Sequence, residues 1–231
     1  MNSDTVYFGI VLSIVTYLIG QWINKKTGFV VLNPLLISIV LIIIILKGLG
    51  IEYDAYNLGG SMISFFLGPA TVLLAIPLFN SLQLLKKNLI PVLCGVIVGS
   101  LTSIASVVLL SKLFGLDDLI IKSFLPKSVT TPIGIELSNQ LGGIPSLTVA
   151  MIVATGIVGA IIGDRILKLF RVKDEISIGV AFGTAAHAIG TSKALEIGKV
   201  PGAFSGLSIG LMGISTSIVL SLFKEFILNI F

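Results

Sequence analysis

Two short segments carry polar side chains that could do chemistry inside an otherwise apolar chain. One reads PKSVTTPIGIELSNQLGGIPSLT and covers residues 126–148, and the other reads GVAFGTAAHAIGTSKALEIG and covers residues 179–198. Ionisable and hydroxyl groups within apolar sequence rarely face lipid, because each of them costs free energy there. Such groups are typical of substrate and proton pathways through a membrane.

The first segment places a lysine and several hydroxyls just before a helical-looking run, residues 133–140. Pro132 suits the first turn of that helix, and Thr131 suits its N-cap. The N-terminus of a helix attracts anions, because its backbone N–H groups have no partner within the helix. The segment therefore predicts an anion site, and the expected ligands are Lys127, Ser128, Thr130 and Thr131.

Glu136 lies one turn into the same predicted helix. It is a candidate for carrying a coupling proton, and with Asn139 it could instead coordinate a cation. The plainer alternative for the whole segment is a loop with ordinary helix capping and an exposed Lys127.

The second segment places Lys193 where a charge at the centre of a membrane helix costs about 2.5–3.5 kcal/mol, so this lysine needs a partner or water. His187 exchanges protons near neutral pH and is the other candidate for proton coupling. The expected substrate ligands here are Thr184, Thr191 and Lys193. In the alternative interpretation, Lys193 and Glu196 reach the membrane interface, and His187 bonds to a neighbouring helix.

Glycines and prolines interrupt several apolar stretches and predict broken helices at membrane depth. A simple proline kink is the alternative for the stretch of residues 58–82. The expected break positions are Gly68, Pro69, Pro77, Pro132, Gly142, Gly143 and Gly190.

The composition identifies the lipid bilayer as the solvent of this chain. Of its 231 residues, 55% are hydrophobic and 11% are charged, and the mean hydropathy is +1.10. These values exclude a soluble globular domain, a disordered chain and a nucleic-acid partner. One cysteine and one histidine do not favour a metal site. No enzymatic motif and no cofactor motif is present, so we expect neither catalysis nor a cofactor.

The apolar stretches predict an all-α membrane protein with about seven crossings and one re-entrant or broken segment, residues 124–146. Basic clusters favour the cytoplasm, which places the N-terminus outside. These clusters are Lys25–Lys26, Lys86–Lys87 and residues 165–173. They share one side of the membrane only if residues 124–146 do not cross it fully.

A weak internal repeat relates residues 30–112 to residues 143–225 within a single domain, residues 1–231. A shift of 111 positions aligns Pro34 with Pro145 and several glycines with glycines. Inverted repeats with two discontinuous helices are typical of transporters that bind substrate near the bilayer midplane.

The two polar segments, together with FFLGPATVLLAIPLF at residues 65–79, resemble the LrgB/CidB family of bacterial membrane proteins. The resemblance implies an antiholin-like protein that acts with a holin-like partner, LrgA or CidA, in control of murein hydrolase activity and cell lysis. The plastid glycolate/glycerate translocator is similar, and related bacterial pairs are implicated in pyruvate uptake.

We therefore expect a transporter, or a transporter subunit, for small carboxylates of the pyruvate or glycolate/glycerate type. It would be proton-coupled, act with the holin-like partner and lie in the bacterial cytoplasmic membrane, with homo-oligomers left open. The alternatives are an antiholin-like regulator without a substrate of its own, and a non-selective pore.

Overall fold

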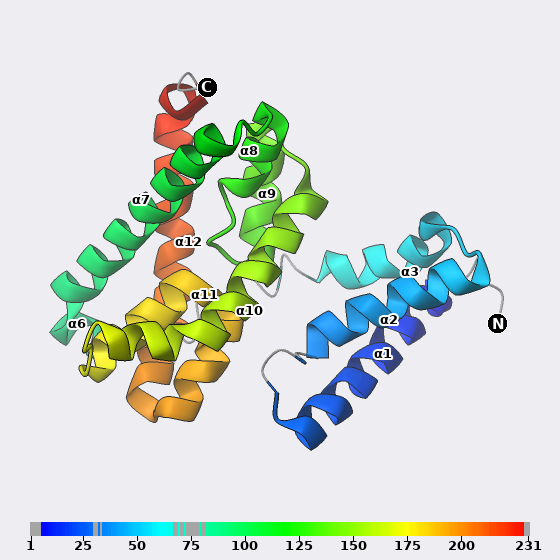
Figure 1. The fold of residues 1–231 in the computed structure, drawn as a ribbon, viewed down its shortest axis with the longest axis horizontal. Coiled ribbons are helices and arrows are strands. Elements are labelled where there is room, and N and C mark those ends of the chain that lie inside the picture. The colour runs from blue at the N-terminus through cyan, green and yellow to red at the C-terminus, as the bar shows by residue number, and fades with distance from the viewer. Residues whose placement is uncertain are drawn as a thin grey trace. The chain divides into compact units, whose positions relative to one another are not determined.

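The computed structural model describes residues 6–29, 32, 34–66 and 82–228, together with residues 69, 72 and 79. All regular elements in these ranges are α-helices, as the sequence predicts. Contacts divide the chain into two compact units, Met1–Val72 and Leu73–Phe231 (Figure 1). Two of the expected breaks, Gly68 and Pro77, lie outside the described residues, whereas Pro69 is helical. The single membrane domain over the whole chain stays a prediction.

Four described helices are long and apolar enough to cross a membrane. They are α1 (Val6–Thr27), α7 (Leu89–Phe114), α10 (Pro145–Leu169) and the Lys199–Lys224 part of α12 (Lys199–Leu228). A shorter apolar helix, α2 (Pro34–Leu49), has 16 residues. The chain is therefore a multi-pass helical membrane protein. The count of about seven crossings and the inverted repeat stay predictions.

The first unit packs α1 against α2 and against α3 (Tyr53–Phe65). Gly9 of α1 and Gly59 of α3 face each other so closely that a Cβ on Gly59 would lie 2.8 Å from the Cα of Gly9. The hydroxyls of Thr16 and Ser38 form a buried hydrogen bond of 2.8 Å between α1 and α2. Small residues and interhelical hydroxyl pairs are the usual means by which helices associate in lipid.

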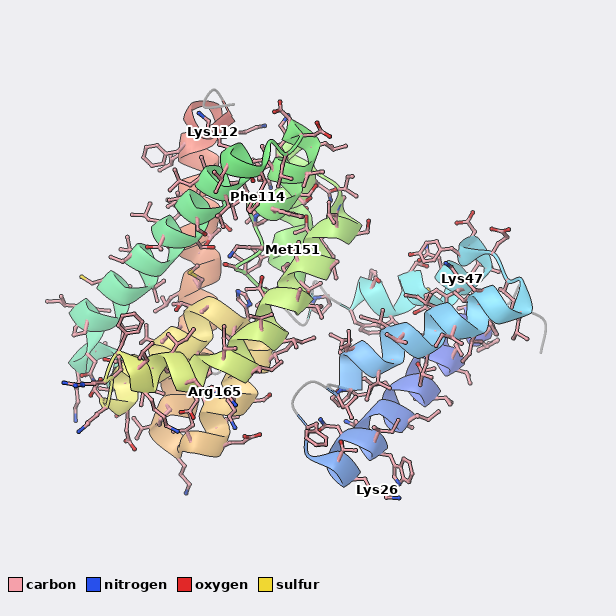
Figure 2. All side chains as sticks on the ribbon, viewed as in Figure 1. Lys26, Lys47, Lys112, Phe114, Met151 and Arg165 are labelled. Carbon is pink, nitrogen blue, oxygen red and sulfur yellow. The ribbon has the colours of Figure 1, made fainter. Side chains whose placement is uncertain are left out.

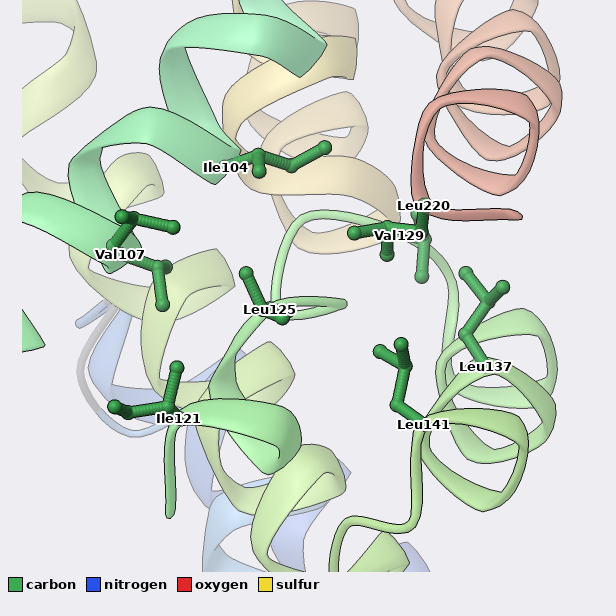
Figure 3. Packing of buried hydrophobic residues seen from close by; sticks show 9 residues of the cluster. Ile104, Val107, Ile121, Leu125, Val129, Leu137, Leu141 and Leu220 are labelled. Atoms are coloured by element: carbon green, nitrogen blue, oxygen red, sulfur yellow. The ribbon is translucent and has the colours of Figure 1, made fainter. Parts of the chain in front are cut away.

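The second unit contains α6 (Leu82–Lys87), α7, α8 (Asp118–Phe124), α9 (Thr131–Leu141), α10, α11 (Glu175–Ile197) and α12. With 7 and 11 residues, α8 and α9 are too short to cross a bilayer alone. A hydrophobic cluster holds them and the loop between them against α7 and α12 (Figure 3). Its buried members include Ile104, Ile121, Leu125, Val129, Leu137 and Leu220.

Helices α11 and α12 pack with their backbones close together. A Cβ on Gly183 would lie 2.8 Å from the Cβ of Ser208, and one on Gly179 would lie 2.5 Å from the carbonyl oxygen of Pro201. A second hydrophobic cluster, which includes Val96 and Phe204, joins these two helices to α7. The packing of α11 on α12 fixes one wall of the cavity described next.

Candidate anion site

The second unit contains a cavity of about 1040 Å³ between α7, α10 and α11. Its lining follows α7 from Asn88 to Ser106 and α10 from Met151 to Leu167. Met151 and Arg165 mark this part of α10 in Figure 2. Along α7 the lining spans roughly 27 Å, at a rise of about 1.5 Å per residue. That length is close to the ~30 Å of a bilayer's hydrocarbon core.

Lys127 reaches this cavity from the loop between α8 and α9. Its Nζ donates hydrogen bonds to the hydroxyl oxygens of Ser103 at 3.2 Å and Ser128 at 3.1 Å. The Ser103 hydroxyl in turn donates to the Ser128 hydroxyl at 2.6 Å. All three side chains line the cavity, so the loop and α7 together build one cluster around the Lys127 ammonium. We call Lys127, Ser103 and Ser128 the lysine cluster.

This lysine cluster has more donors than acceptors. An ammonium group carries three N–H donors and a hydroxyl carries one. Two N–H groups of Lys127 are directed at the serines, which leaves one free, and the Ser128 hydroxyl proton has no acceptor among the described contacts. Both ion pairs found among the described residues lie elsewhere. A half-buried cation with one free N–H of its own and one free hydroxyl proton beside it is suited to an anion.

Helix α11 is broken at His187, whose φ of 50° and ψ of −133° are not helical. These angles lie near the first central position of a type II′ turn, which favours glycine. The turn folds the second half of the helix back. A Cβ on Gly190 would lie 2.7 Å from the carbonyl oxygen of Phe182, eight residues earlier. The expected break at Gly190 is therefore located at His187, and Gly190 instead allows the two halves to approach.

The His187 side chain is 4% exposed, and neither ring nitrogen has a hydrogen-bond partner among the residues that the structure describes. The Lys127 ammonium and the Ser128 backbone both act on it electrostatically. Two further buried hydroxyls have no partner within the described part of the chain. They belong to Thr130, in the same loop as Ser128, and to Ser208, whose Cβ lies beside Gly183. Strained backbone and unpaired buried polar atoms are typical of functional sites.

The structure begins α9 one residue earlier than the sequence predicts. Thr130, rather than Thr131, is the N-cap residue, and its side chain makes no capping hydrogen bond. Pro132 lies in the first turn, and α9 ends at Leu141 with Gly142 in the left-handed conformation at a φ of 74°. Helix ends are uncertain by a residue or two from sequence, because several neighbouring residues satisfy the capping preferences.

The remaining predicted site residues fall into two groups. Thr184 lines the cavity, although its hydroxyl donates to the Val180 carbonyl oxygen at 2.7 Å. Four others do not line it: Thr131, Glu136, Thr191 and Lys193. Thr191 forms a hydrogen bond of 2.7 Å with Ser205, and exposed Glu136 accepts one of 2.9 Å from Gln140.

Lys193 pairs with Glu196 at 2.6 Å, and the glutamate side chain is 63% exposed. Both line a smaller hollow of about 410 Å³. Gly143 packs tightly, since a Cβ there would lie 2.8 Å from the Ser138 hydroxyl. The structure thus brings together Lys127, Ser128 and Thr184, but it does not bring Lys193 to the same cavity.

Sequence reasoning missed Ser103, which lies in a long apolar stretch and joins the lysine cluster from α7. The only available signal was the run of hydroxyls at residues 102–106. It also missed Asp174, which lines the other end of the cavity and caps α11. Hydrogen bonds from the Ser177 hydroxyl and backbone N–H hold the pKa of Asp174 below its usual value.

Long apolar helices, a broken helix with a buried histidine and a cavity that Lys127 lines are together the features of a multi-pass helical membrane protein. The chain belongs to the LrgB-like family, whose model matches residues 13–226. It is 39% identical to the antiholin-like protein LrgB of Bacillus mycoides (strain KBAB4), over 98% of this chain and 99% of that protein. The proteins of the same name from Bacillus cereus (strain B4264) and Bacillus anthracis (strain CDC 684 / NRRL 3495) show the same identity and coverage. No solved structure matches the chain.

Proposed function

We propose that this protein binds a small carboxylate at Lys127 and moves it across the membrane. The observation that carries the proposal is the lysine cluster, in which one N–H of Lys127 and the hydroxyl proton of Ser128 remain available to donate to an anion. A carboxylate accepts both, one at each oxygen, and charge-assisted hydrogen bonds of this kind are strong. The surrounding cavity runs far enough along α7 and α10 to serve as a pathway.

His187 is the proposed proton-coupling group. It is buried beside the lysine cluster at the break in α11, where a change of backbone conformation alters its surroundings. Without substrate, the Lys127 charge would repel a proton on the imidazole, whereas the negative charge of a bound carboxylate would favour it. Proton uptake and carboxylate binding would therefore be coupled. Glu136 is the second candidate for this role, although its side chain is exposed.

The proposed transport is tested by uptake of labelled pyruvate and glycolate in cells that lack their own transporters. The chain is expressed alone and with a holin-like partner of the LrgA or CidA type. Saturable uptake that Lys127→Gln removes supports the proposal. Lys122→Gln is the matched control, because Lys122 lies in α8 but does not line the cavity. Normal membrane levels with no uptake of any carboxylate would contradict the proposal.

The second candidate function is an antiholin-like regulator, and the names of its relatives favour it more directly than transport. In that role the chain would act on a holin-like membrane protein and have no substrate of its own. Polar contacts such as Thr16–Ser38 would then only hold helices together. Lysis control that survives Lys127→Gln in cells with no detectable uptake would support this candidate.

A further inference from the structure

We propose that an anionic phospholipid of the surrounding membrane binds to the second unit, with its acyl chain in the half of the cavity farther from Lys127 and its phosphate on the basic residues at that end. This inference goes beyond the proposed function, because the lipid site does not include the lysine cluster. The open side of the cavity and the uneven charge around its two ends support it.

The cavity is open along one side, between two antiparallel helices. Val98 on α7 and Val158 on α10 both line it, and these residues are 61% and 51% exposed. Four glycines of the two walls face α11, which forms the floor: Gly95 and Gly99 of α7, and Gly163 and Gly159 of α10. Along α11 these contacts run in one direction, while the residue numbers rise on α7 and fall on α10. The start of α7 and the end of α10 therefore meet at the same end of the cavity.

The shape of this half of the cavity suits one acyl chain. A chain there touches α7, α10 and α11 on three sides, so it makes more dispersion contacts than a chain on a convex helix surface. Half of a ~30 Å hydrocarbon core is about 15 Å, which corresponds to about ten residues of helix. That depth extends from Asn88 to Val98 on α7 and from Leu167 to about Val158 on α10. Ser103 of the lysine cluster lies about 8 Å further along α7.

Basic residues surround the end of the cavity at which α7 begins and α10 ends, where Arg165 is labelled in Figure 2. All of them are exposed, and each is within three residues of one that lines the cavity: Lys86, Lys87, Arg165, Lys168, Arg171 and Lys173. Fewer acidic residues lie at this end: Asp164, Asp174 and Glu175. Asp164 pairs with Lys168, and Asp174 caps α11. The remaining basic residues have no ion pair within the described part of the chain.

The charge at the opposite end of α7 is balanced. Lysines and acids are equal in number among the residues around that end: Lys112, Lys122, Lys224, Asp117, Asp118 and Glu136. Basic residues beside a membrane helix attract anionic lipids, and a guanidinium matches the geometry of a phosphate. The excess of positive charge therefore selects an anionic headgroup at one end of the cavity only.

The headgroup is tested by lipid binding to the full-length protein, purified in detergent and followed by native mass spectrometry. Phosphatidylglycerol and phosphatidylcholine with the same acyl chains are titrated separately. One phosphatidylglycerol should bind at least about tenfold more tightly than phosphatidylcholine, and Lys86→Gln combined with Lys87→Gln should remove most of this preference. Lys25→Gln combined with Lys26→Gln is the matched control, because these lysines also end a helix but belong to the first unit. No preference in the unmodified protein, or an equal loss in both double variants, overturns the inference.

Val158→Trp tests whether the acyl chain lies in the cavity. The larger side chain occupies the space of the chain without crowding the core, because Val158 is exposed. Phosphatidylglycerol should bind at least about tenfold more weakly, since losing the burial of two methylene groups is sufficient for that. Ile97→Trp is the matched control, because Ile97 is 47% exposed on α7 but does not line the cavity. Equal effects of the two variants, or displacement of the lipid by an equal concentration of glycerol 1-phosphate, would show that the cavity holds no acyl chain.

Lys127→Gln separates the lipid site from the proposed carboxylate site. Phosphatidylglycerol binding should be unchanged in this variant, because the lysine cluster lies beyond the end of the acyl chain. A loss of lipid binding would place the phosphate at Lys127 and overturn the inference. Lipid binding as expected without any carboxylate uptake contradicts only the proposed function. Dimers of the chain that Val158→Trp dissociates, with no bound phosphatidylglycerol, would assign the open side to a second copy instead of a lipid.

Discussion

Two lysines in similar sequence surroundings have opposite environments in this protein. Lys127 is half-buried, lines the large cavity and, among the described residues, has serine hydroxyls as its hydrogen-bond partners. Lys193 forms an ion pair of 2.6 Å with Glu196 beside a smaller hollow. Both lie among threonines, serines and glycines in an apolar chain. A polar motif in an apolar chain is therefore a candidate site only where its charged side chain has no oppositely charged partner nearby.

Spacing explains the difference. Glu196 follows Lys193 by three residues on one helix, and side chains three or four apart share a face. Lys127 has no such neighbour, because it lies in a loop, and Glu136 nine residues later is occupied by Gln140. The sequence alone therefore contains the information that Lys193 has a partner.

The largest expected effect comes from neutralising the two lysines separately. Lys127→Gln should weaken carboxylate binding by roughly 10- to 150-fold, the usual value of a hydrogen bond to a charged group. Lys193→Gln should change it by less than about threefold, because exposed ion pairs contribute little. Uptake at low substrate concentration, corrected for membrane level, is the measurement. Equal losses in both variants would show that both lysines belong to one binding site, and the contrast between their environments would then be wrong.

Gly190 tests whether the two halves of α11, on either side of His187, pack against each other. A Cβ at this position would lie 2.7 Å from the Phe182 carbonyl oxygen, so Gly190→Ala should force the halves apart and destabilise the protein by about 1–3 kcal/mol. Gly206→Ala is the control, because nothing lies within 4 Å of a Cβ there. Thermal denaturation in detergent should separate the two variants, and equal stability would show that α11 is not folded back as described.

His187 allows the strain of the break to be separated from the chemistry of the imidazole. Its φ of 50° suits glycine, so His187→Gly should be more stable than His187→Ala by about 1–3 kcal/mol, although both lose the same ring. Both variants should lose proton-coupled uptake if the imidazole carries the proton. Denaturation and uptake in an imposed pH gradient are the two measurements. A less stable glycine variant would mean that the backbone at residue 187 is not strained.

Much of the architecture follows from local sequence, and the parts that do not follow have a physical cause. The helical class, the membrane environment and the end of α9 near Gly142 depend on composition and on single-residue preferences. A break in α11 was expected at Gly190, but its position at His187 could not be predicted, because the positive φ falls on a histidine while Gly190 allows close packing instead. Ser103 was missed because it reaches Lys127 across 24 residues of sequence.

Asp174 gives the smallest effect and extends the comparison of Lys127 with Lys193 to a third charged residue, which lines the same cavity as Lys127. Like Lys193, it has a local partner, since the Ser177 hydroxyl and N–H both donate to its carboxylate. Asp174→Ala should therefore cost about 0.5–2 kcal/mol of stability, as loss of an N-cap does, and leave carboxylate affinity unchanged.

Because these hydrogen bonds lower the pKa of Asp174, its contribution to stability is present above the usual carboxyl pKa and disappears as the pH falls through the lowered value. The stability difference between Asp174→Ala and the unmodified protein should accordingly shrink on acidification. A difference that persists in acid would assign the effect to packing at the cavity mouth, and a loss of carboxylate affinity would place Asp174 with Lys127 instead of with Lys193.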